Sequence, residues 1–224
     1  MKLYMHPVST TSRPVLLFIA DHGLEVEEQV VDLMTGEHMQ PAYRAINPSG
    51  IVPMLEDDDF RLGESSAILK YLADKVGSPT YPTGLRERAR VNEVMDWLNT
   101  NLYREYGYNL VYPQIFPHYK RRTAESQDET VAVGEERSRR WLEVLDRHII
   151  GPDSPFLCGQ QITIADYLGA GILTLGDTIG CTFADYPNVQ RWLANMRALP
   201  NWPKVHGVFD GMVAAFSAGT YRAI

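Results

Sequence analysis

Two short stretches in the first third of the chain have residue types and spacing suited to binding a small peptide. In the first, residues 47–50 read Asn-Pro-Ser-Gly and predict a turn, because Pro48 fixes φ and Gly50 permits a positive φ. Val52-Pro53 follows at the start of an apolar run, where a proline marks a strand start or edge and is a candidate for a cis peptide bond. The backbone of Val52 is therefore free to pair with an extended peptide.

The second stretch, Glu64-Ser65-Ser66, predicts the start of a helix whose apolar positions follow at Ile68 and Leu72. A helix N-terminus with hydroxyls and free N–H groups attracts a carboxylate. The carboxylate of Glu64 complements it by accepting an ammonium group. Together these groups match the zwitterionic end of a small peptide, whereas the alternative interpretation is a turn, an edge strand and a capped helix with no ligand.

A third polar stretch, residues 9–12, lies between a predicted strand at residues 2–5 and a predicted helix that starts at Arg13-Pro14. A hydroxyl donor and a helix dipole both favour a thiolate over a thiol. Lowering a thiol pKa by two units requires about 2.7 kcal/mol. We expect Ser9 to supply this donor, rather than to act as a base or nucleophile. Thr10 and Ser12 are alternative donors, and all of these hydroxyls are also compatible with plain N-cap and loop roles.

Taken together, these stretches resemble the glutathione-binding core of cytosolic glutathione transferases, and the theta-like and bacterial members most of all. The resemblance covers nearly the whole chain, because five motifs follow the order that is typical of the family. They are Ser9 to Arg13, Asp32 to His38, Asn47 to Pro53, Glu64-Ser65 and Thr163 to Asp166. No cysteine occurs before residue 158, which is unlike the members that use a cysteine, and Tyr4 only loosely resembles the tyrosine of other classes.

The resemblance implies a co-substrate, glutathione, and a role for each matching residue. Ser9, four positions before Arg13, would stabilise the thiolate, and His38 would contact the glycine carboxylate. The tripeptide backbone would lie on Ile51, Val52 and Pro53, and its γ-glutamyl end on Glu64 and Ser65. The wall of the electrophile pocket would include Tyr103 and Tyr106, with Arg104 as the alternative.

The elements that position these residues divide into two predicted domains. Residues 1–77 read strand, helix, strand, helix, strand, strand, helix, which is the order of a thioredoxin-like fold. Residues 78–84 are rich in Ser, Pro and Gly and form a linker. Residues 85–224 are predicted to be all-helical, with a long helix from Arg86 to about Tyr112 that Pro113 ends or kinks. Further helices are predicted at 124–149, 163–176, 187–199 and 205–216. Thr163 and Asp166 predict a capping box with a structural role.

Composition limits the partners and the compartment. The net charge of −7 disfavours a nucleic acid or an anionic membrane. No apolar run approaches the ~18 residues of a membrane span, and the N-terminus lacks the pattern of a signal peptide. Cys158 and Cys181 form neither a CxxC pair nor a metal-binding spacing, which predicts no metal and a reducing cytoplasm.

The resemblance therefore implies a detoxification enzyme that transfers glutathione to an electrophilic small molecule. The resemblance also implies a two-fold homodimer, in which the helix near Ser66 and Lys70 contacts the long helix of the other subunit. The alternatives are a glutathione-dependent dehalogenase, a peroxidase or disulfide reductase on the same fold, and a non-catalytic glutathione- or ligand-binding module.

Overall fold

The computed structural model describes residues 1–224 and begins with a four-stranded mixed sheet in the order β2-β1-β3-β4. β1 pairs in parallel with β2, whereas the β1–β3 and β3–β4 pairs are antiparallel. Leu3 lies opposite Leu55 in the register, and both side chains are fully buried. The strands are β1 (Lys2–Met5), β2 (Glu27–Val30), β3 (Met54–Asp57) and β4 (Phe60–Leu62).

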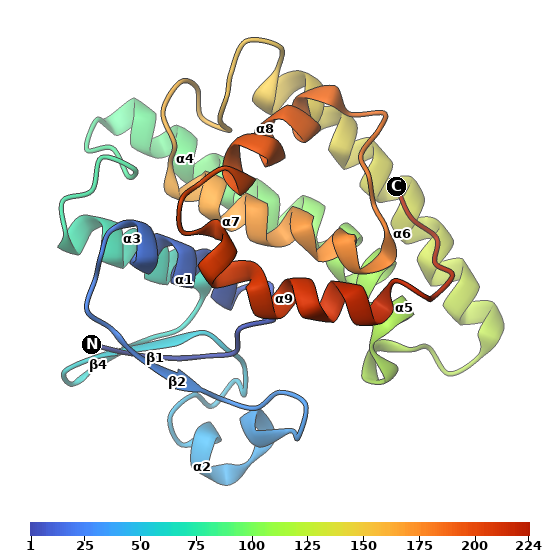
Figure 1. Cartoon of the computed structure of the whole chain (residues 1–224), viewed down its shortest axis with the longest axis horizontal. Helices are drawn as coiled ribbons and strands as arrows, with labels where there is room; N and C mark the ends of the chain where they lie inside the picture. Colours follow the sequence, from blue (N-terminus) through green and yellow to red (C-terminus); the bar gives the residue numbers. More distant parts are fainter.

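Helices cover both faces of this sheet, which confirms the thioredoxin-like fold of the first domain. Two of them, α1 (Ser12–Asp21) and α3 (Ser65–Lys75), lie on the face toward the helical domain, and α2 (Pro41–Arg44) lies on the other (Figure 1). A single 3-10 turn, η1 (Glu37–Met39), precedes α2. In α1 every residue from Ser12 to Ile19 is buried, because this helix is packed between the sheet and the second domain.

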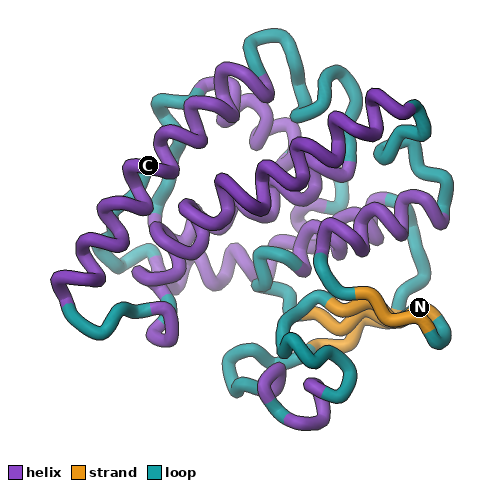
Figure 2. Tube along the Cα trace, turned by 180° about the vertical axis from the view of Figure 1, so that it is seen from behind, coloured by secondary structure: helices purple, strands orange, loops and turns teal.

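The second domain is entirely helical, as predicted, and the strands are confined to the opposite end of the molecule (Figure 2). Its apolar core is continuous with the core of the first domain, since a single cluster contains both Leu3 and Trp192. Its elements are α4 (Leu85–Trp97), η2 (Leu98–Tyr103), η3 (Tyr106–Val111), α5 (Tyr112–Ile115), η4 (Pro117–Tyr119), α6 (Ala124–Val144), η5 (Leu145–Ile150), α7 (Ile164–Leu173), η6 (Thr174–Ile179), α8 (Pro187–Arg197) and α9 (Trp202–Phe216).

The long helix predicted to end at Tyr112 differs from the structure in one respect. Two π-helical segments, η2 and η3, follow α4, and the chain then continues as α5 through Pro113. Pro113 is tolerated because it occupies the first turn of α5, where its missing N–H is not needed. π-turns close i→i+5 hydrogen bonds, so residues three apart no longer share one face as they do in an α-helix.

The central helix α7 is buried over its whole length, and Asp166 anchors its start. The carboxylate accepts the backbone N–H groups of Thr163 and Leu157, each at 2.7 Å, and the indole N–H of Trp192 at 2.9 Å. Because these donors come from the preceding loop and from α8, Asp166 joins three segments around α7. Asp166 is therefore structural, as the sequence indicates.

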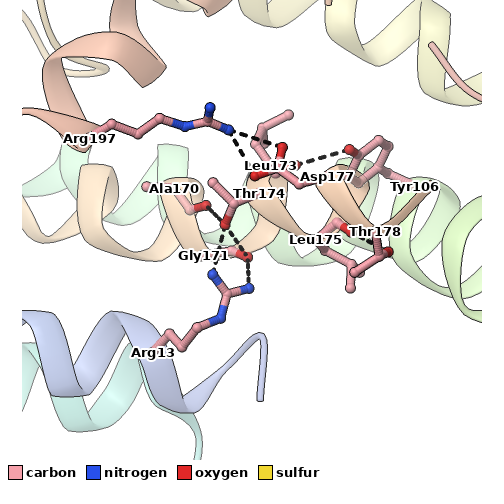
Figure 3. Close-up of polar contacts among 10 residues, drawn as sticks. All are labelled: Arg13, Tyr106, Ala170, Gly171, Leu173, Thr174, Leu175, Asp177, Thr178 and Arg197. Carbon is pink, nitrogen blue, oxygen red and sulfur yellow. Dashed lines mark hydrogen bonds and ion pairs between the residues drawn. The ribbon is translucent and has the colours of Figure 1, made fainter. Parts of the chain in front are cut away.

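Arg13 joins the two domains directly (Figure 3). Its guanidinium is fully buried and donates to Thr174 Oγ1 at 2.8 Å and to the carbonyl of Gly171 at 3.1 Å. Its Cζ also lies 3.6 Å from the ring centroid of Phe209 on α9. Gly171 on α7 lets the start of α1 approach closely, because a Cβ on Gly171 would come within 2.4 Å of Pro14 Cγ. The loop before α1 is thus fixed against the helical domain.

Candidate functional site

Ser9 lies in the loop between β1 and α1, and its hydroxyl is tied to the start of the helix. Its Oγ accepts the backbone N–H of Ser12 at 3.2 Å, and its carbonyl accepts the N–H of Arg13 at 3.1 Å. Of the three hydroxyls considered from the sequence, Ser9 is half-buried, whereas Thr10 is 5% exposed and Ser12 is fully buried. Ser9 is thus the only one of the three that is not buried.

Thr11 links Ser9 to the Val52-Pro53 segment of the other polar stretch. Its Oγ1 donates to the carbonyl of Val52 at 3.0 Å and lies 3.2 Å from Ser9 Oγ. Since the proton of Thr11 is committed to Val52, the bond between the two hydroxyls is donated by Ser9. The proton of Ser9 therefore points toward Thr11 Oγ1, which in turn donates to Val52.

His6 precedes Ser9 by three residues but does not serve it as a base. Its Nδ1 accepts the backbone N–H of Val8 at 3.3 Å, and burial lowers the pKa of His6 below its ordinary value. The only contact of this residue with Ser9 is a backbone bond, from the N–H of Ser9 to the carbonyl of His6 at 2.9 Å. The geometry therefore suits Ser9 as a hydrogen-bond donor rather than as an activated nucleophile.

Two side-chain hydrogen bonds fix the backbone of the turn before Val52. The carbonyl of Ile51 accepts the hydroxyl of Tyr43 and the side-chain amide of Asn47, each at 2.7 Å. The bond between Val52 and Pro53 is cis, as the sequence suggests, and both residues are buried. These bonds leave the side chain of Ile51 exposed at the surface.

His38 lies next to this turn. Gly50 adopts φ of +63°, and a Cβ at Gly50 would lie only 3.1 Å from the carbonyl oxygen of His38. The turn thus requires glycine for both its conformation and its contact. The Nδ1 atom of His38 is buried and has no hydrogen-bond partner within the chain. His38 therefore retains an unpartnered side-chain nitrogen, in a residue whose backbone lies close to Gly50.

Glu64 and Ser65 stand together at the N-terminus of α3, as predicted. Glu64 is exposed, makes no capping bond to the helix, and holds a left-handed backbone with φ of +63°. For a residue other than glycine this conformation costs about 1–3 kcal/mol, and such strain is concentrated at binding sites. Ser65, the first residue of α3, is 6% exposed. A free carboxylate thus stands beside free helical N–H groups.

Aromatic side chains of η2, η3 and α5 face the Ser9 loop. Tyr112 donates to Thr10 Oγ1 at 3.0 Å, and its hydroxyl lies 2.6 Å from that of Tyr103. The ring of Tyr108 is 43% exposed and lies 5.2 Å from the ring of Tyr112. Burial raises the pKa of Tyr108 above its ordinary value.

The structure does not bring Tyr106 to this group. Its ring is fully buried, and its hydroxyl donates to the carbonyl of Leu173 at 3.0 Å, deep in the helical core (Figure 3). The reason is the π-helical backbone, which separates the faces of Tyr103 and Tyr106. Arg104 is exposed and pairs with Glu105 at 3.1 Å, and Tyr4 packs edge-on against Tyr43 at 6.1 Å.

Sequence reasoning missed Thr11 and Tyr112 as members of the site. Thr11 was one of four neighbouring hydroxyls with no distinguishing signal, and Tyr112 was one of several aromatic residues near a helix end. No group of three histidine, cysteine or acidic side chains is arranged to hold a metal ion. None of the helices is both long enough and apolar enough to span a membrane.

Comparisons with known proteins match two family models to this chain. Residues 1–74 match the family model for the glutathione S-transferase N-terminal domain, and residues 107–200 match the model for the C-terminal domain. Human glutathione S-transferase theta-2B is 33% identical over 201 residues, which cover 88% of this chain and 81% of the human protein. Glutathione S-transferase D7 of Drosophila melanogaster is 28% identical, over 90% of this chain and 87% of its own length.

Two solved structures of human theta-class glutathione transferases resemble this chain over nearly its full length. One, in complex with the glutathione conjugate of 1-menaphthyl sulfate, has a TM-score of 0.84 and 30% identity, over 96% of this chain and 88% of its own. The other, theta-2 in complex with glutathione and an unknown ligand, has a TM-score of 0.83 and 29% identity, over 100% of this chain and 93% of its own.

Proposed function

The chain belongs to the glutathione S-transferase family, and from that premise we propose how its own residues conjugate glutathione to an electrophilic small molecule. Ser9 donates its hydroxyl proton to the sulfur of bound glutathione and stabilises the thiolate. The thiolate attacks an electrophilic carbon, which carries a leaving group or an activated double bond. A leaving group departs with its electron pair, whereas addition to a double bond is completed by a proton from solvent.

The observation that carries this proposal is the accessibility of Ser9 beside Val52. Ser9 is half-buried, whereas Thr10 and Ser12 are buried. Thr11 is half-buried too, but it donates its proton to the carbonyl of Val52, so Ser9 is the accessible hydroxyl that is left to donate to a ligand. The N–H of Ser12 donates to Ser9 Oγ, which makes Ser9 a better donor in turn, because chained hydrogen bonds polarise one another. A hydrogen bond to a charged group is worth about 1.5–3 kcal/mol, enough to lower a thiol pKa by one to two units.

The remaining residues of the first domain hold the tripeptide. The backbone of Val52, before the cis bond to Pro53, pairs with the cysteine residue of glutathione as an added strand does. Glu64 accepts the ammonium of the γ-glutamyl end, and Ser65 with the first N–H groups of α3 binds its carboxylate. The unpartnered Nδ1 of His38, next to Ile51, supports a role in binding the glycine carboxylate.

The electrophile occupies the cleft between the Ser9 loop and the helical domain. Tyr103 and the more exposed Tyr108 supply its aromatic wall, with ring centroids 5.1 Å apart. Tyr106 takes no part in it, because it is fully buried in the helical core. Flat aromatic electrophiles suit a wall of this kind, since aromatic groups pack favourably edge to face.

The test is conjugation of glutathione to an aryl halide, followed by ultraviolet absorbance, with wild type and Ser9→Ala. We expect glutathione-dependent turnover by the wild type and a loss of ten- to one-hundredfold in the variant at neutral pH. An inactive wild type that still binds glutathione would favour a binding module instead.

We also propose a homodimer and a cytoplasmic location. Exposed apolar side chains near α3 and the start of α4 support the dimer, above all Phe60 and Leu85, which are 46% and 85% exposed. The two cysteines, Cys158 and Cys181, are both free thiols, as a reducing compartment would keep them.

A further inference from the structure

A row of three hydroxyls connects the helical domain to the loop that carries Ser9. It consists of Tyr103, Tyr112 and Thr10, which are 8%, 8% and 5% exposed, and we call it the hydroxyl row. The oxygens of the two tyrosines lie 2.6 Å apart, and Tyr112 donates to Thr10 Oγ1 at 3.0 Å. Thr10 and Tyr112 are 102 residues apart in the chain, so the row crosses from one domain to the other.

The protons of this row all point the same way. The single proton of Tyr112 goes to Thr10, so the bond between the two phenols is donated by Tyr103. Thr10 then retains its own proton at the end of the row, one residue from Ser9. Burial raises the pKa of both Tyr103 and Tyr112, so both remain neutral donors at physiological pH. Hydrogen bonds aligned in this sense polarise one another.

The two tyrosine rings have little freedom to move. A Cβ on Gly107 would come within 2.5 Å of the ring of Tyr103, so that ring lies directly on the helix backbone. The ring of Tyr112 stacks on Tyr119 at 4.9 Å, with 22° between the planes. The position of Thr10 is therefore set by the helical domain, and with it the position of the neighbouring Ser9.

We propose that the hydroxyl row positions the catalytic loop: through its hydrogen bond to Thr10, the helical domain holds the neighbouring Ser9 at the bound sulfur. This inference rests on the proposed function, in which Ser9 is the catalytic donor. Tyr112 and Tyr103 do not touch the substrate sulfur and act as positioning residues. The row thus makes thiolate formation in the first domain depend on residues of the second.

The test compares the pKa of the bound glutathione thiol, measured by thiolate absorbance and by the pH dependence of kcat/KM, in wild type and Tyr112→Phe. The variant removes only the oxygen that donates to Thr10. We expect the thiol pKa to rise by about half to one unit, the shift that a neutral hydrogen bond is worth. The rate should fall severalfold at neutral pH and recover at higher pH, while KM for glutathione stays unchanged.

Tyr167→Phe is the matched control. Tyr167 is 3% exposed, and its hydroxyl donates to Asp21 Oδ2 at 3.0 Å, so the variant loses one tyrosine hydrogen bond at a position remote from the loop. We expect it to lose stability as Tyr112→Phe does but to keep the wild-type thiol pKa. If Tyr112→Phe loses the same factor of activity at every pH, or leaves the thiol pKa unchanged, the row is only packing and the inference is overturned.

A pair of substitutions at Thr10 tests whether Tyr112 acts through it. Thr10→Val should raise the thiol pKa, whereas Thr10→Ser, which keeps the hydroxyl, should leave it near the wild-type value. Adding Tyr112→Phe to Thr10→Val should cause no further shift, and independent, additive shifts would overturn the inference. If Tyr112→Phe does not fold, the comparison of Thr10→Val with Thr10→Ser decides alone.

The failure of this inference is distinguishable from the failure of the proposed function. If the wild type binds glutathione without lowering its thiol pKa, both the proposed role of Ser9 and the inference about the hydroxyl row are refuted. If the wild type lowers the thiol pKa but the substitutions at Tyr112 and Thr10 leave that pKa unchanged, only the role of the hydroxyl row is refuted.

Discussion

At the scale of single residues, Ser9 depends on neighbours that fix where its proton can go. Ser12 donates to its oxygen, and Thr11 has already committed its own proton to Val52. Ser9 is left as a donor with no proton acceptor strong enough to deprotonate it. This arrangement supports the proposal that the site stabilises an anion that glutathione supplies and does not create a nucleophile on the protein.

The first prediction concerns this hydroxyl. Ser9→Ala should raise the pKa of bound glutathione by one to two units and lower kcat/KM at neutral pH by ten- to one-hundredfold, because a hydrogen bond to a charged group contributes about 1.5–3 kcal/mol. Ser9→Thr keeps a hydroxyl and should retain part of the activity. The measurement is the pH–rate profile together with calorimetric affinity for glutathione, which should change little.

Ser12→Ala is the control for that prediction. Ser12 is fully buried, and its Oγ accepts the N–H of His6 at 3.4 Å. The substitution should lower stability and leave the thiol pKa unchanged. The assignment of Ser9 fails if Ser12→Ala shifts the thiol pKa and Ser9→Ala does not.

The second prediction concerns the γ-glutamyl end of glutathione. Ser65→Ala should weaken binding by about 1–3 kcal/mol, because a charged partner is left under-satisfied at the start of α3. Glu64→Gln should weaken the binding of glutathione more than that of an analogue without the amino group. Calorimetry measures both, and an equal loss for the two ligands would show that Glu64 does not contact the ammonium.

Sequence alone predicted the residues of this site whose meaning lies in local spacing. A few neighbouring positions are enough to recognise Ser9 before a helix, the turn at Asn47–Gly50 and the pair Glu64-Ser65. Thr11 and Tyr112 could not be found in this way, because their partners are 41 and 102 residues distant. A hydrogen bond between remote residues exists only once the packing of the elements is known.

At the scale of elements, apolar periodicity predicted nearly every helix but not the π-turns of η2 and η3. A π-turn widens the helix and redirects each following side chain. One consequence is that the hydroxyl of Tyr103 meets that of Tyr112 near the Ser9 loop, whereas the hydroxyl of Tyr106 donates to Leu173 in the helical core. Another is a close crossing with α6, where Gly134 lies against the backbone of Asn109.

The third prediction tests that crossing. A Cβ on Gly134 would come within 2.6 Å of the carbonyl carbon of Asn109, so Gly134→Ala should lower the free energy of unfolding by about 1–3 kcal/mol through overpacking. Gly207→Ala in α9 is the matched control, since a Cβ there meets no atom within 4 Å. It should stabilise the protein by up to about 1 kcal/mol, because alanine favours a helix. Urea denaturation measures both, and equal effects would contradict the close crossing.

At the scale of the whole molecule, the junction of α1 with α9 makes stability depend on pH. His206 is 2% exposed, stacks on Trp202 at 3.6 Å, and borders a cavity of about 180 Å³ between η6 and α9. Burial lowers the pKa of His206 to about 3, and the charge of Arg13 contributes in the same direction. The folded protein therefore prefers the neutral imidazole.

The fourth prediction follows from the sign of this shift. Because the unfolded chain binds this proton near pH 6.5, stability is fully present above that pH and falls as the pH drops toward 3. The loss at pH 4.5 is about 2–3 kcal/mol from this group. His206→Phe should remove that part of the pH dependence in urea denaturation at pH 7 and 4.5, whereas His118→Gln, at an exposed position, should retain it. If the wild type and both variants lose the same free energy of unfolding between pH 7 and pH 4.5, His206 is not the cause of the pH dependence.

The fifth prediction concerns the assembly of two chains. Phe60 on β4 is 46% exposed and packs against Tyr71 of α3 at 5.4 Å, next to Lys70, so an apolar group stands where the homodimer contact is proposed. Light scattering at micromolar concentration should give twice the chain mass of 25.3 kDa. Phe60→Glu should shift the mass to that of one chain, because an unpaired charge buried in an interface costs several kcal/mol. Val208→Glu replaces another exposed apolar side chain, on α9 and 57% exposed, and should leave the dimer intact. A wild type with the mass of one chain contradicts the dimer itself, whereas a dimer that survives Phe60→Glu places the contact on another face.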